Sequence, residues 1–225
     1  MKIARSGKEL LEICAAEQIS LSEYAIRQEM ELKNVSREDL FAQMKITLDA
    51  MKESATAGRE KKVYSLSGLI GGDAYRLQQY CNTGNSLMGN GIVMAMAMAI
   101  SSSEVNGAMA SCAVVELMGG TPKMSLDAAA IIFKNVLGLV CDPVAGLVEI
   151  PCAKRNVSGA INALCTADMV MAGVNSKIPF DDAVAAMYKV GTGLPEELRE
   201  TALGGCAITP TGKALQEKVF GKKEN

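Results

Sequence analysis

Apolar side chains recur with the period of an α-helix along the N-terminal part of the chain. Between residues 6 and 62 they lie three or four positions apart, and Lys and Glu fill many of the positions between them. Ser6 and Ser22 are candidate N-caps, and Ser36 followed by Asp39 is typical of a capping box with Asp in place of Glu. We therefore expect residues 6–62 to form a helical N-terminal layer whose charges lie on a solvated face.

The remainder of the chain consists of apolar segments separated by glycine and proline. Those two residues end helices, whereas Ser, Thr and Asp at the segment starts are typical N-caps. No βαβ or β-hairpin pattern is present, so we predict an all-α fold class and one multi-helix globular domain over residues 1–225. The predicted helices cover 73–81, 88–102, 107–118, 126–137 (capped by Ser125) and 156–172, and later ones begin near Asp181, Pro195 and Thr211.

The composition predicts an unusual core. Hydrophobic residues make up 49% of the chain, yet aromatic residues make up 4%, Trp is absent and 14 residues are Met. We therefore expect a buried core rich in Ala and Met. Gly159, Ala160, Ala163 and Ala167 recur at helical spacing in the predicted 156–172 helix, and such small residues allow a neighbouring helix to approach closely.

Charge and cysteine usage exclude several classes of protein. A net charge of −2 predicts no nucleic-acid surface. The longest apolar run, 91–100, is far shorter than the about 20 residues of a membrane span. Seven cysteines, an odd number, fit poorly with a disulfide framework, and no signal-peptide pattern is present. We expect a cytoplasmic protein whose thiols are free or bind metal.

The stretch 140–156 contains several residues whose side chains can bind a metal or a substrate. It holds Cys141, Cys152, two prolines and the run Lys154-Arg155-Asn156. The prolines restrict the backbone and remove two hydrogen-bond donors, so the stretch is predicted to be a constrained segment rather than a flexible connector. Its thiols are either metal ligands or buried apolar groups, since their spacing differs from the C-x2-C pairs typical of zinc and iron–sulfur sites.

A second candidate segment, 61–72, interrupts the helical pattern with serines and glycines. Ser67 and Gly68 could form a loop whose backbone N–H groups bind an anion. The same residues are equally suited to a tight turn that binds nothing.

Several motifs together resemble the iron–sulfur-dependent L-serine dehydratase alpha chain family. The central one is Val-Cys-Asp-Pro-Val-Ala-Gly-Leu-Val-Glu-Ile-Pro-Cys-Ala-Lys-Arg-Asn at 140–156. The other matching segments lie on both sides of it and extend the resemblance over most of the chain: Ser67–Asp73, Glu116–Pro122, Ile178–Asp181, Leu194–Thr201, Gly204-Gly205 and Thr209–Gly212.

The resemblance implies a function and a cofactor. The family eliminates water from L-serine, giving pyruvate and ammonia, with a [4Fe–4S] cluster that has three protein thiolates and one open iron acting as a Lewis acid. It implies that Cys141 and Cys152 are two of the three ligands. The remaining cysteines lie in apolar or helical contexts and match no cluster position: Cys14, Cys81, Cys112, Cys165 and Cys206. Of these, Cys112 is interpreted as a core residue.

The resemblance also suggests substrate-binding residues. Lys154 and Arg155 follow Cys152 closely enough to hold the substrate carboxylate or lower the pKa values of the thiols, or they form a surface pair at a helix start. Asn156 would cap the following helix or donate to substrate. Ser67 and Gly68 belong to a possible substrate-side loop.

One departure from the family pattern lies between Asn106 and Gly107. There the family has a long Gly/Ala/Pro-rich region, which carries the third cluster cysteine in a Gly-Cys-Gln context. This sequence runs directly from one residue to the other, so the third ligand is absent from it. A deletion and a sequence that omits part of a longer protein both account for the difference.

The sequence also predicts a partner. It contains no histidine, so the commonest general base near neutral pH is missing. The family has a beta chain with a Ser-Ser-Ser-His-Thr type motif, which the Ser101–Glu104 run mimics only superficially. We expect the catalytic base on that chain, and an oligomer with it. The alternatives are a helical structural or regulatory subunit without a cluster, and a metal-free or zinc-bound enzyme of another class, for instance a related cysteine-processing lyase that shares the fold.

Overall fold

The computed structural model describes residues 3–60, 63–65, 67–70 and 102–221. Within these ranges it contains eight α-helices, and its only strand is the two-residue β1 (Val63–Tyr64). The helices are α1 (Gly7–Glu17), α2 (Leu21–Lys33), α3 (Arg37–Glu60), α6 (Ser102–Leu117), α7 (Pro122–Asn135), α8 (Cys152–Met171), α9 (Phe180–Gly193) and α10 (Pro210–Phe220). The predicted all-α fold class is confirmed. No described helix is both long enough and apolar enough to cross a membrane.

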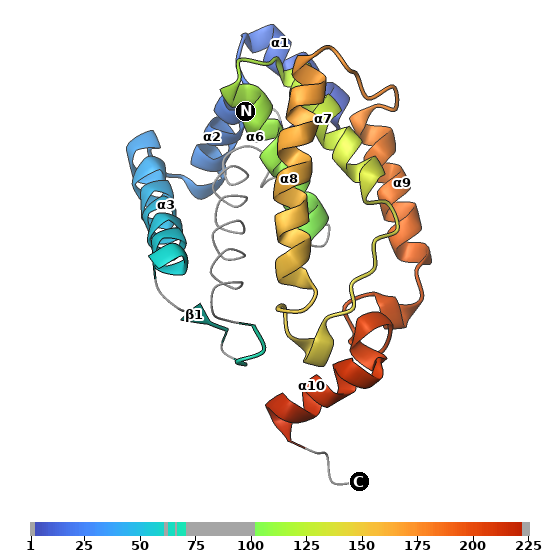
Figure 1. Cartoon of the computed structure of the whole chain (residues 1–225). Helices are drawn as coiled ribbons and strands as arrows, with labels where there is room; N and C mark the ends of the chain where they lie inside the picture. The colour runs from blue at the N-terminus through green and yellow to red at the C-terminus, as the bar shows by residue number, and fades with distance from the viewer. Residues whose placement is uncertain (1–2, 61–62, 66, 71–101, 222–225) are drawn as a thin grey trace.

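The core lies between α6, α7, α8 and α9 (Figure 1). Helix α6 packs against both α7 and α8, and α9 packs against α7. Alanine is the most frequent buried residue there, as the composition predicted. Among the described methionines Met109 is buried, whereas Met124, Met171 and Met187 pack at the margins of the core.

The N-terminal half of α6 packs closely against α8. A Cβ atom added to Gly107 would lie 3.4 Å from the carbonyl oxygen of Gly159. Further along α8, Ala163 and Ala167 are fully buried. The small residues therefore let the two helices approach each other, as their spacing predicted.

Helices α1 and α2 form a layer across the end of this bundle where α9 begins (Figure 1). Ser6 caps α1 as predicted, because its hydroxyl oxygen accepts from the Glu9 N–H (3.1 Å). The Asp181 carboxylate, from the first turn of α9, accepts from the N–H groups of Gly7 (2.5 Å) and Lys8 (3.0 Å). Asp181 thus satisfies two of the donors that a helix start leaves without an intrahelical partner.

Ser36 acts as a cap, as predicted, and accepts from the Asp39 N–H (3.1 Å). Three other predicted caps are wrong. Pro122 and Pro210 occupy the first helical position, which suits proline, so their helices begin earlier than the apolar pattern indicated. The observed caps are Ser20, Thr121 and Thr209 rather than Ser22, Ser125 and Thr211.

Two other boundaries differ from the prediction. Helix α6 begins at Ser102 rather than at residue 107, and Pro195 precedes a short 3-10 turn, Glu196–Leu198, rather than an α-helix. The predicted helices at 73–81 and 88–102 lie outside the described residues, apart from the last residue of the second.

Candidate functional site

The two predicted cluster cysteines lie at the ends of one loop, which enters α8 at the end of the bundle near α10 (Figure 1). Cys141 pairs with the segment around Arg199 in a single parallel bridge. Its N–H donates to the carbonyl of Leu198 (2.9 Å), and its carbonyl accepts from the N–H of Glu200 (2.8 Å). This pairing fixes the backbone of Cys141 against a segment almost 60 residues later in the chain.

The loop between the two cysteines is closed on itself. The Val144 N–H donates to the carbonyl of Ile150 (2.8 Å), and the intervening 3-10 turn, Val144–Gly146, packs against α10. The Ile150–Pro151 peptide bond is cis. Helix α8 begins directly after Pro151, so Cys152 is its first residue. Both thiols are half-buried, and their backbones are set by defined structure, as the prolines predicted.

Asn156 does not cap a helix, and that alternative is wrong. The helix begins at Cys152, earlier than the predicted 156, so Asn156 lies in its second turn. Its side-chain Oδ1 is buried and accepts no hydrogen bond from the described residues.

A buried carboxylate holds the loop in place. Asp142 is 2% exposed, and its Oδ2 accepts from the backbone N–H of Cys206 (2.6 Å). Its Oδ1 lies 2.9 Å from Nη2 of Arg155 in an ion pair. The Nη1 of Arg155 donates to the carbonyl of Val140 (2.7 Å). Asp142 therefore joins the cysteine loop, the first turn of α8 and the segment that precedes α10.

Glycine is required where that segment meets Asp142. Gly205 has φ +56°, and a Cβ atom there would lie 2.3 Å from Oδ2 of Asp142. A Cβ atom on Gly204 would lie 2.7 Å from the carbonyl oxygen of Glu197. Gly205 lets the backbone approach the Asp142 carboxylate and Gly204 lets it approach the Glu197 carbonyl, which explains the motif physically.

The electrostatics follow from these contacts. Burial alone raises the pKa of Asp142, but hydrogen bonds from Cys206 and Arg155 outweigh it and hold that pKa below its ordinary value. For Cys152 the balance is opposite: burial raises the pKa of the thiol more than the Arg155 charge lowers it. The Arg155 charge lowers the pKa of this thiol, as predicted, but burial raises it by more.

Ser67 lies against the cysteine loop, because its hydroxyl donates to the Glu149 carboxylate, 82 residues later in the chain. The turn that carries Ser67 is closed by hydrogen bonds from the N–H of Ser65 to the carbonyl of Ile70 (2.8 Å) and from the N–H of Gly68 to the carbonyl of Ser65 (2.9 Å). Gly68 has φ +72°, and its N–H is engaged inside the turn. Gly68 therefore lies in a closed turn, whereas Ser67 contacts the site; binding of substrate by either residue stays a prediction.

The two predicted basic residues, Lys154 and Arg155, lie in different environments. Lys154 is exposed on the first turn of α8. Arg155 is partly buried and uses both Nη atoms to hold the loop. Their binding of a substrate carboxylate stays a prediction.

Cys112 is a core residue, as predicted. It is fully buried in α6, and its thiol donates to the carbonyl of Ser125 (3.2 Å). Burial, with the Glu116 charge, raises its pKa to about 12, so it remains protonated at neutral pH.

The other cysteines divide into two groups. Cys14 is buried, whereas Cys165 and Cys206 are exposed. Cys206 belongs to the site through its backbone bond to Asp142, and the hydrogen bond with this carboxylate raises the pKa of its thiol. Neither Asp142 nor Cys206 was predicted as a site residue; the signal for Asp142 was its position between Cys141 and Pro143. Cys81 lies outside the described residues.

The described residues fit a [4Fe–4S] cluster in part. Such clusters are held by cysteine thiolates, and Cys141 and Cys152 supply two in half-buried positions. Within the described part of the chain, no group of three or more His, Cys, Asp or Glu side chains is placed to hold a metal ion. The structure thus shows two donors of the required type and no third beside them among these residues.

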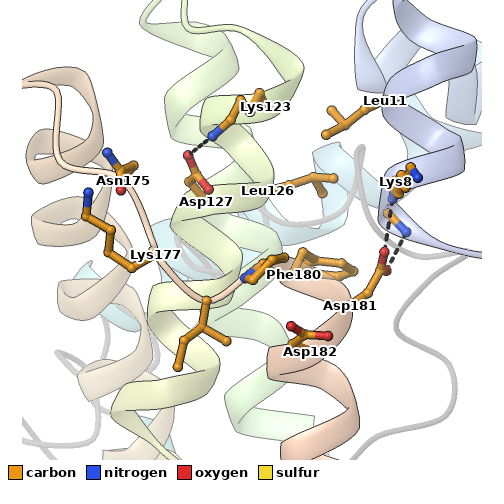
Figure 2. Close-up of a pocket in the computed structure, with 13 residues that line it drawn as sticks. Lys8, Leu11, Lys123, Leu126, Asp127, Asn175, Lys177, Phe180, Asp181 and Asp182 are labelled. Atoms are coloured by element: carbon orange, nitrogen blue, oxygen red, sulfur yellow. Dashed lines mark hydrogen bonds and ion pairs between the residues drawn. The ribbon is translucent and has the colours of Figure 1, made fainter.

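A separate cavity of about 670 Å³ lies between α1, α7 and the segment that leads into α9 (Figure 2). Lys123 on its wall pairs with Asp127 (2.6 Å), and Asp181 points toward the start of α1. The lining contains no thiol. The Asp181 contacts hold α1 against the bundle, at the opposite end from the cysteine loop (Figure 1).

Comparisons with known proteins agree with the motifs. The family described as "Serine dehydratase alpha chain" matches residues 16–109 and 106–207. The "Probable L-serine dehydratase, alpha chain" of Bacillus subtilis (strain 168) is 39% identical over 96% of this chain and 95% of its own length. The "L-serine dehydratase, alpha chain" of Peptoniphilus asaccharolyticus is 32% identical over 94% of this chain and 96% of its own.

Two further details bear on the length of the chain. The alignment with the Bacillus subtilis protein extends over 287 residues, more than the 225 of this chain, so that relative has residues without a counterpart here. The "L-serine dehydratase TdcG" of Escherichia coli (strain K12) is 41% identical over 44% of this chain, which is 22% of its own length.

Proposed function

The chain belongs to the serine dehydratase alpha chain family, and on this premise we propose that it is the alpha subunit of an iron–sulfur L-serine dehydratase. The reaction is the elimination of water from L-serine, followed by hydrolysis of the resulting imine to pyruvate and ammonia. The observation that supports the proposal is the position of Cys141 and Cys152 at the two ends of one closed, anchored loop.

In this proposal Cys141 and Cys152 hold a [4Fe–4S] cluster, and the third thiolate comes from a segment with no counterpart between Asn106 and Gly107. Lewis acidity toward the serine hydroxyl is the chemistry that the cluster supplies when bound. The chain's own contribution is geometric: Asp142 and Arg155 hold the loop so that both thiols keep their positions. Because the thiols must stay reduced, the proposal places the protein in the cytoplasm.

The proposal includes a beta chain that carries the catalytic base. The 225 residues contain no histidine, and the relatives that match most of the chain are described as alpha chains. We expect the partner to dock over residues 141–156 and to complete the carboxylate pocket, so that the active enzyme is an oligomer of the two chains.

Pyruvate formation from L-serine tests the proposal. The chain, with the segment that carries the third cysteine restored between Asn106 and Gly107, is purified without oxygen, reconstituted with iron and sulfide, and assayed alone and with the beta chain. We expect turnover only when both chains are present. Equal turnover in the two assays would place the base in this chain, and Glu104 would be tested first. No turnover by the two chains together, with a full complement of iron, would reject the function.

A second candidate function has one specific observation in its favour. The described residues contain no three-ligand metal group, which is what a helical structural or regulatory subunit without a cluster would show. Iron and labile sulfide measured on the protein isolated without oxygen decide between the two functions. Competition between L-serine and L-cysteine as substrates decides whether the chain belongs to a cysteine-processing lyase instead.

A further inference from the structure

A cavity of about 240 Å³ lies beside the cysteine loop, between the C-terminal half of α7 and the first half of α8. Helix α8 lines it with Arg155, Ser158 and Asn162, which are spaced by three and four residues and therefore share one face of the helix. One wall of the cavity thus carries a cation, a hydroxyl and an amide in a row.

The opposite wall is mainly apolar. Ile132, Val136 and Leu139 line it from α7 and the residues that follow, and Asn135 adds an amide. Gly107 at the α6 side has no side chain to fill the space, and a Cβ atom there would lie 3.4 Å from Cγ2 of Ile132. The cavity therefore combines a polar wall with an apolar one, the usual composition of a small-molecule site.

Arg155 connects the cavity to the cysteine loop. Its Nη1 donates to Val140, and its Nη2 pairs with Asp142, the residues on either side of Cys141. A guanidinium has five N–H donors, so this side chain retains donors beyond the two contacts. A carboxylate bound to them would lie next to the loop that carries both predicted cluster ligands.

The size and polarity of the cavity indicate what kind of ligand it can bind. The volume is below the about 300 to 1,000 Å³ typical of sites for drug-sized ligands, which suits a molecule as small as an amino acid. Arg155 matches a carboxylate, the side-chain carbonyl oxygen of Asn162 matches an ammonium group, and Ser158 can bond to a second polar group.

We propose that this cavity binds the α-carboxylate and α-ammonium groups of the amino-acid substrate, with Arg155, Ser158 and Asn162 as binding residues. The choice of L-serine as that amino acid rests on the proposed function. The site differs from the one predicted from the sequence, because it places the substrate on the α7 side of α8 and adds Ser158 and Asn162, which lie beyond the 140–156 motif, to Arg155.

Binding of L-serine to the full chain, purified without oxygen, tests the proposal. The dissociation constant is measured by isothermal titration for the wild type, Asn162→Ala and Asn175→Ala. Asn175 is a matched control because it lines the distant cavity of Figure 2. We expect Asn162→Ala to weaken binding about tenfold, the effect of one lost hydrogen bond to a charged group, and Asn175→Ala to change nothing. Absence of saturable binding by the wild type, or equal affinities of the two variants, would overturn the site.

A second variant keeps the test decisive if Asn162→Ala fails to fold. Ser158 is exposed, so Ser158→Leu fills the cavity from its rim without adding a residue to the core. We expect it to abolish L-serine binding while the melting temperature stays unchanged. Unchanged binding by Ser158→Leu would contradict the proposal.

The KM for L-serine, measured with the beta chain present, separates this inference from the proposed function. Pyruvate formation with the same KM in the wild type and Asn162→Ala would reject the site and leave the function standing. If the wild type binds L-serine, Asn162→Ala does not, and the protein forms no pyruvate even with the beta chain, the site would be supported and the function rejected.

Discussion

The carboxylate of Asp142 and the guanidinium of Arg155 lie 2.9 Å apart, with Asp142 only 2% exposed. This pair connects the residue after Cys141 to the fourth residue of the helix that Cys152 begins. Since a buried charge is costly without a partner, each side chain holds the other in place. The relative position of the two thiols therefore depends on a contact in which neither thiol takes part.

Removal of the charge at position 142 is expected to destabilise the protein. Asp142→Asn leaves Arg155 without its partner, and breaking a partly or fully buried pair in this way costs about 3 kcal/mol. Urea unfolding followed by circular dichroism measures the free energy of unfolding. Asp182→Asn, at an exposed position, is the control and should change it by less than about 0.5 kcal/mol. Similar stabilities of the two variants would show that the buried pair has no such role.

Gly205→Ala is expected to be more harmful than alanine at another glycine with positive φ. At Gly205 the new Cβ would lie 2.3 Å from the Asp142 carboxylate, whereas at Gly119, with φ +83°, it would meet nothing within 4 Å. Gly119→Ala should cost the backbone strain alone, about 1 to 2 kcal/mol. Gly205→Ala adds the clash, so its free energy of unfolding should be lower still, as measured in urea. Equal costs would mean that the backbone moves aside without penalty.

Asp181 is expected to attach α1 to the bundle. Its carboxylate accepts two N–H groups at the start of α1, so Asp181→Ala should lower the free energy of unfolding by about 1 kcal/mol, the usual value of a cap. Hydrogen exchange should become faster in α1 and stay unchanged in α8. Asp182→Ala, one residue further along α9, is the control. Exchange in α1 that is equally slow in both variants would contradict the attachment.

Glu23 is expected to have an acidic pKa of about 2 in the folded chain, because hydrogen bonds from Arg37 and then Arg27 stabilise its charged form. Because folding lowers the pKa of this carboxyl group, its charged form stabilises the folded protein at pH values above its unfolded pKa of about 4.5. This contribution is lost as the pH falls toward about 2. Carbon-13 NMR titration of the Glu side chains measures the pKa directly. Arg37→Gln should raise it, and a pKa that the variant leaves unchanged would refute the assignment.

Loss of either loop cysteine is expected to remove the cluster. In the protein that carries the third cysteine in a segment between Asn106 and Gly107, Cys141→Ala and Cys152→Ala, purified without oxygen, should each lose iron and labile sulfide, because a cluster with one ligand fewer dissociates readily. Cys165→Ala is the matched control, since that thiol is exposed on the same helix as Cys152. Full retention of iron in either loop variant would exclude that residue as a ligand.

The sequence by itself determined the all-α fold, the Ala-rich core, the end of α6 near Gly119 and the constrained loop between Cys141 and Cys152. These features follow from local physical chemistry: helical periodicity, small side chains at helical spacing, and the backbone limits of glycine and proline. The misplaced caps of α7 and α10 have the same local origin, because proline was expected to end helices, whereas Pro122 and Pro210 begin theirs.

The tertiary structure alone decided which residues distant in the sequence contact each other. Asp142 meets Cys206, Ser67 meets Glu149, and Asp181 meets the start of α1. The partners in these contacts are between 64 and 174 residues apart in the chain, and no periodicity or spacing relates them. A buried carboxylate and a surface one have the same letter in a sequence; Asp142 became a structural residue only when folding removed it from water and placed Arg155 and a backbone N–H beside it.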